Sequence, residues 1–206
     1  MLDRLAEWVA AVVQALGYPG LTALVALESV FPPIPSEVIL PLAGFLTGQG
    51  RFSFVLVMIA TTLGSIIGAL VLYGIGAAIG PHRVHALVAR FGRFALLTTD
   101  DLARAESWFD RYGPIAVFTG RLVPIVRSLV SIPAGYRRMP LGQFVLLTAA
   151  GSGLWNGALV ALGWVFGENW HVIEQFVGWF QYVVIAVVLL LVLRFVWTRL
   201  RSRSAT

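Results

Sequence analysis

Four charged residues lie within otherwise apolar stretches of the sequence: Glu28, Glu37, Arg121 and Arg127. On insertion scales a charge at the centre of a bilayer costs roughly 2.5–3.5 kcal/mol, so such residues need partners or a polar cavity. Two acids and two bases cancel in formal charge, and the least costly arrangement brings the two stretches together. Arginine binds phosphate through charge-assisted hydrogen bonds, and a desolvated carboxylate favours its protonated form. The four residues therefore predict phosphate binding by Arg121 and Arg127 and proton coupling by Glu28 and Glu37, with purely structural salt bridges as the alternative.

The composition predicts an integral membrane protein. Of 206 residues, 58% are hydrophobic and only 12% are charged, and the mean hydropathy is +0.84, whereas about a quarter of the residues in soluble domains are charged. A soluble enzyme and a nucleic-acid-binding module are therefore excluded as the main interpretation, and the net charge of +5 is attributed to membrane orientation. The sequence contains no cysteine, so disulfides and thiolate chemistry are excluded.

Apolar stretches of two kinds indicate how the chain meets the membrane. Three uncharged runs are long enough to span a bilayer: 52–81, 139–167 and 175–193. Two other stretches, 21–50 and 113–138, are apolar but interrupted by proline and charge, and broken helix survives at membrane depth only where protein or a wet cavity covers it. We interpret both as re-entrant helical hairpins. The residues expected to break the helices are Pro32, Pro33, Pro35, Ser36, Pro124, Pro133 and Gly135.

Similar spacings of proline, glycine and charge predict a diverged internal repeat. Each unit is a hairpin followed by a span: 21–50 with 52–81, then 113–138 with 139–167. A hairpin returns to the side from which it came and a span does not, so two successive units have opposite orientations. The predicted fold is thus an all-α membrane protein of two inverted repeats within 18–167, a layout used by secondary transporters.

Flanking segments complete this organisation. Residues 1–17 are predicted to form an amphipathic interfacial helix, and 168–206 a final span with an Arg-rich tail. Residues 82–112 are predicted to form two cytoplasmic amphipathic helices, the second of which follows a cap at Thr98 or Thr99. On this topology one side receives ten arginines and the other only Arg4 and Arg51. The Arg-rich side, which includes the C-terminus, is therefore predicted to be cytoplasmic.

The second broken stretch resembles a known family signature. Phe118-Thr119-Gly120-Arg121-Leu122-Val123-Pro124-Ile125-Val126-Arg127, followed by Ser131-Ile132-Pro133-Ala134-Gly135, is similar to the F-x-G-R-x-x-P-x-x-R…P-x-A-G pattern of DedA membrane proteins, which carry the VTT domain. Glu28 and Pro35-Ser36-Glu37 resemble the acidic hairpin of that family, in which some members have Asp at the position of Glu37.

The resemblance implies lipid transport in the bacterial cytoplasmic membrane. Family members are associated with returning undecaprenyl phosphate to the inner leaflet or moving phosphatidylethanolamine, with dependence on the proton motive force. We therefore expect a flippase or scramblase without a cofactor, in which Arg121 and Arg127 form the essential basic pair and Glu28 and Glu37 the essential acidic pair.

Several weaker signals have alternative explanations. Asn156 either lines a cavity or hydrogen-bonds to a neighbouring helix, and the GxxxG pairs serve close packing within the fold or in a homo-oligomer. The His82-x-x-His85 pair lacks a third ligand, so no metal site is predicted; Ser36 and Ser128 lack a histidine base and are interpreted as helix caps. A proton-driven transporter of a small solute or drug and a membrane-organising protein stay open as functions, whereas a lipid phosphatase lacks the expected histidine nucleophile.

Overall fold

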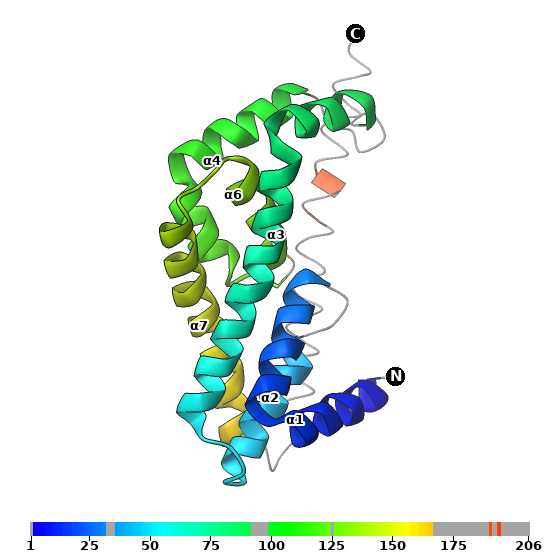
Figure 1. Cartoon of the computed structure of the whole chain (residues 1–206), viewed down its shortest axis with the longest axis vertical. Coiled ribbons are helices and arrows are strands. Elements are labelled where there is room, and N and C mark those ends of the chain that lie inside the picture. Colours follow the sequence, from blue (N-terminus) through cyan, green and yellow to red (C-terminus); the bar gives the residue numbers. More distant parts are fainter. Residues whose placement is uncertain are drawn as a thin grey trace.

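The computed structural model describes residues 2–31, 36–91, 99–124 and 126–166, together with 190 and 193–194. All regular elements in these ranges are helices, as predicted (Figure 1). They are α1 (Leu2–Val30), α2 (Ser36–Gly48), α3 (Phe54–Phe91), α4 (Thr99–Gly120), α5 (Val126–Leu129), α6 (Ser131–Tyr136) and α7 (Leu141–Phe166).

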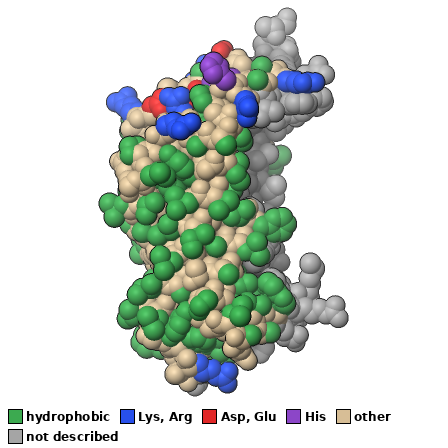
Figure 2. Space-filling view, viewed as in Figure 1, with side chains coloured by type: hydrophobic (Ala, Val, Ile, Leu, Met, Phe, Trp, Pro, Cys, Tyr) green, Lys and Arg blue, Asp and Glu red, His purple; other side chains and the backbone are tan. Residues whose placement is uncertain are grey.

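Three helices in the described residues are long and apolar enough to cross a membrane: Trp8–Val30, Phe54–Arg90 and Leu141–Phe166. Hydrophobic side chains cover the middle of the molecule in Figure 2, charged side chains gather at its upper end, and a small basic patch lies at its lower end. A surface of this kind matches hydrocarbon between two aqueous boundaries. The predicted span 52–81 lies in α3, which continues to Phe91, and the predicted span 139–167 contains α7. The predicted span 175–193 lies mostly outside the described residues.

Two glycines interrupt the long helices. Gly17 has φ 61° and ψ −139°, and it separates the first part of α1 from the part that continues through Pro19. Gly80 has φ 69° and ψ 164° and precedes Pro81. Both are left-handed conformations that residues with a Cβ adopt only at a cost. The straight part of α3 therefore ends where the predicted span ends, and the following segment folds across one end of the molecule (Figure 1).

The helix α4 corrects one predicted boundary. The sequence separated a surface helix ending at Tyr112 from a hairpin beginning at Gly113, but α4 is continuous from Thr99 to Gly120. Proline usually excludes helical geometry at the preceding residue because its ring clashes with that residue's Cβ. Gly113 has no Cβ, so Pro114 is accommodated within the helix.

Two of the predicted helix-breaking residues lie inside a helix. The chain leaves helical geometry over Arg121–Pro124, whereas Pro133 and Gly135 belong to α6. Pro133 is the third residue of α6, in the first turn, where the missing N–H is tolerated. Pro32, Pro33 and Pro35 lie outside the described residues, and Ser36 begins α2.

The helices pack crosswise between the two halves of the chain: α2 on α7, and α6 on α3. Four glycines make these contacts so closely that an added methyl group would overlap the facing backbone. The facing pairs are Gly44 with Val160, Gly163 with Pro41, Gly135 with Tyr73, and Gly76 with Ile132. Small residues allow such close approach of membrane helices, so these glycines serve packing within the fold.

Candidate functional site

An ion pair joins the two broken apolar stretches at the centre of the molecule. Glu28 lies in the last turn of α1 and Arg127 in α5, and the Arg127 guanidinium binds the Glu28 carboxylate. The Glu28 side chain is fully buried, and only 13% of the Arg127 side chain is exposed. Charge balance predicted that opposite charges bring the two broken stretches into contact, and the Glu28–Arg127 pair makes such a contact.

Arg121 occupies a second buried position beside this pair. One guanidinium nitrogen donates to the backbone carbonyl of Arg127, and the other donates to Ser131 Oγ at 2.8 Å and to Thr148 Oγ1 at 3.3 Å. The guanidinium carbon lies 5.6 Å from the centre of the Phe144 ring, within the range of cation–π attraction. Within the described part of the chain no acid neutralises Arg121, so its charge is held by hydroxyl and carbonyl oxygens.

The two predicted acids have different surroundings. Glu28 is paired with Arg127, whereas Glu37, the second residue of α2, is half-buried and forms no ion pair with the described residues. Ser36 beside it is buried, and its hydroxyl has no hydrogen-bond partner in the described ranges. The interpretation of Ser36 as a helix cap is therefore wrong. Ser128 lies inside the four-residue helix α5.

Asn156 links the two long spans. Its side chain is fully buried in α7, and Nδ2 donates to Ser65 Oγ on α3 at 3.2 Å. Of the two predicted roles, the hydrogen bond to a neighbouring helix is therefore present. Asn156 Oδ1 has no partner among the residues that the structure describes, which leaves a buried acceptor at this position.

Two hydroxyl partners of Arg121 were not predicted as site residues. Ser131 was noticed only as part of a sequence signature, and Thr148 lies within a predicted span. A hydroxyl inside an apolar helix is a weak signal, because it can instead bond to the backbone of its own helix. Thr61 shows this behaviour, since its hydroxyl donates to the carbonyl of Val57.

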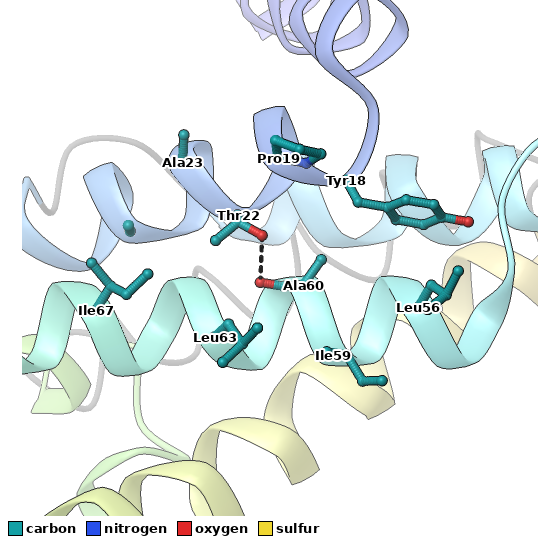
Figure 3. Close-up of a pocket in the computed structure, with 10 residues that line it drawn as sticks. Tyr18, Pro19, Thr22, Ala23, Leu56, Ile59, Ala60, Leu63 and Ile67 are labelled. Atoms are coloured by element: carbon teal, nitrogen blue, oxygen red, sulfur yellow. Dashed lines mark hydrogen bonds between the residues drawn. The ribbon is translucent and has the colours of Figure 1, made fainter.

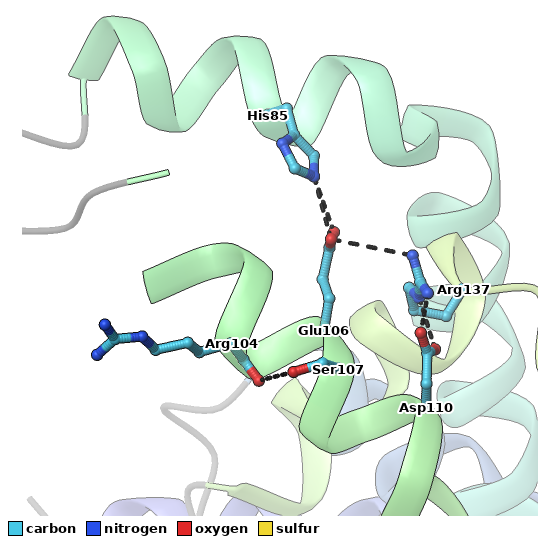
Figure 4. A network of polar contacts seen from close by, with 6 residues as sticks. All are labelled: His85, Arg104, Glu106, Ser107, Asp110 and Arg137. Carbon is cyan, nitrogen blue, oxygen red and sulfur yellow. Dashed lines mark hydrogen bonds and ion pairs between the residues drawn. The ribbon is translucent and has the colours of Figure 1, made fainter. Parts of the chain in front are cut away.

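A separate polar network fastens the Arg-rich end of the molecule (Figure 4). His85 Nε2 lies 3.1 and 3.2 Å from the two carboxylate oxygens of Glu106. Arg137 lies 3.9 Å from the same carboxylate and hydrogen-bonds Asp110 through two nitrogens. The hydrogen bonds that Arg137 donates to the Asp110 carboxylate raise the pKa of Arg137 above its usual value, so Arg137 stays charged. The network joins the segment after Gly80, α4, and the connection between α6 and α7.

Comparison with known protein families identifies the family to which the chain belongs. A model of the VTT domain matches residues 34–165, a range that contains Glu37, both buried arginines and the whole of α7 except its last residue. The chain belongs to the VTT-domain (DedA) family. The resemblance inferred from the sequence signature is thereby confirmed. No solved structure matches the chain.

Bacterial relatives of this VTT-domain protein match most of its length. An "Alkaline phosphatase-like protein" of Lactococcus lactis subsp. cremoris is 40% identical over 88% of this chain and 85% of the relative. "Undecaprenyl phosphate transporter A" is 33% identical in Staphylococcus aureus, over 89% of this chain and 90% of the relative. The protein of that name in Bacillus subtilis is 32% identical over 92% of this chain and 91% of the relative. With the apolar helices, these relatives support a bacterial multi-pass membrane protein and, at the family level, transport of a membrane lipid carrier.

Proposed function

We propose that this protein moves undecaprenyl phosphate, or another phospholipid such as phosphatidylethanolamine, between the leaflets of the bacterial cytoplasmic membrane. Transport is coupled to protons. The observation that carries the proposal is the buried ion pair of Glu28 and Arg127 next to Arg121, at the place where the two broken stretches meet. Buried ion pairs contribute little net stability once desolvation is counted, so three buried charges in a membrane domain favour a functional role.

In this mechanism the lipid phosphate and the Glu28 carboxylate compete for the guanidinium of Arg127. In the structure the Glu28 carboxylate pairs with the Arg127 guanidinium. Protonation of Glu28 removes its negative charge and frees Arg127 to bind a lipid phosphate through charge-assisted hydrogen bonds. Arg121 is already oriented by Ser131 and Thr148 and lies beside the backbone of Arg127, so the two guanidinium groups bind the same headgroup. Deprotonation of Glu28 then competes with the phosphate and releases it.

Glu37 and Asn156 have supporting roles in this proposal. Glu37 is half-buried without an ion-pair partner among the described residues, which suits a carboxylate that receives protons from an aqueous opening. The unpartnered Oδ1 of Asn156 supplies a hydrogen-bond acceptor for a polar group that passes between α3 and α7.

The architecture that we propose for this transport is a pair of inverted repeats, each with a re-entrant hairpin. The crosswise glycine contacts support it, because each contact in one half has a counterpart in the other: Gly44 on Val160 corresponds to Gly135 on Tyr73, and Gly163 on Pro41 corresponds to Gly76 on Ile132. The end that carries the His85–Glu106–Arg137 network is placed on the cytoplasmic side, because it holds most of the described arginines.

Reconstitution in liposomes tests the function. Fluorescent polyprenyl phosphate or phosphatidylethanolamine is placed in one leaflet, and transfer is measured with and without a pH gradient. We expect transfer that the gradient accelerates, loss of transfer in Arg127→Ala, and loss of the gradient effect in Glu28→Gln. Arg104→Ala, an exposed arginine at the charged end, is the control and is expected to retain transfer.

The same assay separates the alternatives. Equal transfer with and without the gradient indicates a passive scramblase, and absence of transfer for both lipids contradicts the proposal and favours a small-solute transporter or an organising role. The name of the Lactococcus relatives raises phosphatase activity as a second candidate. Release of inorganic phosphate from the lipid, measured in the same samples, decides whether that candidate holds.

A further inference from the structure

An apolar groove lies between α1 and α3, and none of the buried charges lines it (Figure 3). It has a volume of about 510 Å³. Small residues such as Ala26 and Ala60 line it, together with larger side chains of α3. Three of these, Leu56, Leu63 and Ile67, have between 46% and 49% of their surface exposed. The groove is thus open along its length and lined by hydrocarbon.

The polar groups at the groove are already satisfied. Thr22 Oγ1 donates to the carbonyl oxygen of Ala60 at 3.0 Å, and the hydroxyl of Tyr18 accepts from the backbone N–H of Ser53 at 2.9 Å. A polar ligand therefore finds few free partners here, and leaving its own polar groups unpaired costs free energy. The chemistry of the lining favours an apolar ligand.

The length of the groove matches one leaflet of a bilayer. From Leu56 to Ile67 the axis of α3 rises by about 17 Å, at about 1.5 Å per residue, and half of a hydrocarbon core is about 15 Å. One end lies at Tyr18 and Leu56, near the α2–α3 turn that carries the exposed Arg51. The other end lies at Ala26, two residues before Glu28. The groove therefore runs from one membrane boundary to the level of the buried ion pair.

We propose that this groove binds the long hydrocarbon tail of the transported lipid while the lipid rests in the leaflet at the Arg51 end. This inference rests on the proposed function and adds a tail-binding site to its phosphate site. A lipid held in this way has its headgroup at the boundary near Arg51, a basic residue suited to a phosphate, and the part of its tail that lies in the groove reaches the depth of Glu28. Tail recognition and phosphate recognition then lie in different parts of the molecule.

Substitutions that fill the groove test the proposal. Ala26→Phe occupies the groove from α1, and Ala23→Phe, at an exposed lining position, is a second variant that need not disturb the core. Ala150→Phe is the matched control, because Ala150 is an exposed alanine of α7 outside the groove. Binding to purified protein is measured for a long polyprenyl phosphate, a two-isoprene phosphate, the uncharged long polyprenol and a diacyl phosphatidic acid.

We expect the groove variants to bind the long polyprenyl phosphate at least about tenfold more weakly, since several methylene groups lose their apolar contacts. The two-isoprene phosphate should bind with unchanged affinity, and Ala150→Phe should match the wild type. Loss confined to the polyprenyl ligands identifies an isoprenoid tail, and an equal loss for phosphatidic acid identifies tails in general. A photoreactive long-chain phosphate should label peptides that contain residues 18–26 or 56–67.

Two results overturn the inference. Unchanged long-chain affinity in both groove variants, or photolabelling confined to other surfaces, means that bulk lipid fills the groove. The binding measurements with the different lipids also distinguish failure of the groove proposal from failure of the proposed function. If the wild type binds neither phosphate, the phosphate site fails, whereas binding of uncharged polyprenol that Ala26→Phe weakens still supports the groove.

Discussion

The Glu28–Arg127 pair makes a prediction that separates a structural role from a functional one. Removing one partner, as in Glu28→Leu or Arg127→Leu, leaves a buried charge unpaired and should cost about 3–5 kcal/mol of stability. The double variant removes both charges and should recover most of that loss, because apolar residues often replace a buried pair without penalty. The melting temperature in detergent measures the stability. We expect the double variant to be folded and unable to transport lipid.

Transport activity of that double variant decides between the two roles. If it transports lipid at the wild-type rate, the pair only fastens α1 to α5. A double variant as unstable as the single variants would instead show that the two side chains do not contact each other.

The hydroxyl of Thr148 should contribute to phosphate binding through Arg121. Thr148→Val removes the 3.3 Å hydrogen bond but leaves Ser131 and the Arg127 carbonyl as partners of Arg121. We expect a loss of about 1 kcal/mol, or about fivefold in affinity for a short-chain lipid phosphate, measured by titration. Thr61→Val is the control, since Thr61 bonds only to its own helix. Equal affinities of the two variants would contradict a role for Thr148.

The sequence identified the charged residues of the candidate site but not their pairing. A charge in an apolar stretch is recognisable from residue type alone, because any charged side chain has to be desolvated there, whichever partner it later finds. Which acid meets which arginine depends on helix rotation and depth, and the structure pairs Glu28 with Arg127 while Glu37 has no ion-pair partner in the described part. Ser131 and Thr148 were not predicted, because a hydroxyl in an apolar helix can equally bond to the backbone of its own helix.

The close contact between α3 and α6 predicts unequal effects of two neighbouring substitutions. A methyl group at Gly76 would overlap the carbonyl of Ile132, whereas a methyl group at Gly74 meets open space. Gly76→Ala should therefore cost about 1–3 kcal/mol through overpacking, and Gly74→Ala should be neutral or stabilising. Thermal unfolding of both variants measures the difference. Similar melting temperatures would mean that α3 and α6 are less tightly packed.

A helix boundary was predictable where glycine and proline together interrupt the helix. It was not predictable where the position of a proline within the helix allows the helix to continue. The span 52–81 ends as expected at Gly80–Pro81, because a left-handed glycine and a proline together interrupt a helix. The boundary predicted between residues 112 and 113 and the break predicted at Pro133 are wrong because both Pro114 and Pro133 lie where a helix accommodates proline. Pro114 follows a glycine, and Pro133 lies in a first turn.

The orientation of the whole molecule is directly testable because the chain has no cysteine. Gln49→Cys lies in the turn between α2 and α3, and Ser107→Cys lies on α4 at the network end; both positions are exposed. We expect a membrane-impermeant maleimide to label position 49 in intact spheroplasts and position 107 only after permeabilisation. The cysteine-free parent is the control. The reverse pattern would contradict the predicted cytoplasmic placement of the Arg-rich end.

Counting arginines in the sequence predicted that charged residues gather at one end of the molecule, but it did not predict the contacts that these residues make there. Ten arginines on one predicted side indicated a cytoplasmic face, and the structure has charged side chains at that end (Figure 2). The His85–Glu106–Arg137 network was not predicted, since its members are far apart in the sequence and come together only after α3 turns at Gly80.

The crosswise packing also has a consequence for how the chain is made. Gly44 contacts α7 at Val160, a residue that leaves the ribosome more than a hundred residues later. At about 5–20 residues per second, α2 waits on the order of ten seconds for its partner. During that interval α7 does not yet cover the small-residue face of α2, so the first half of the chain enters the membrane before its packing is complete.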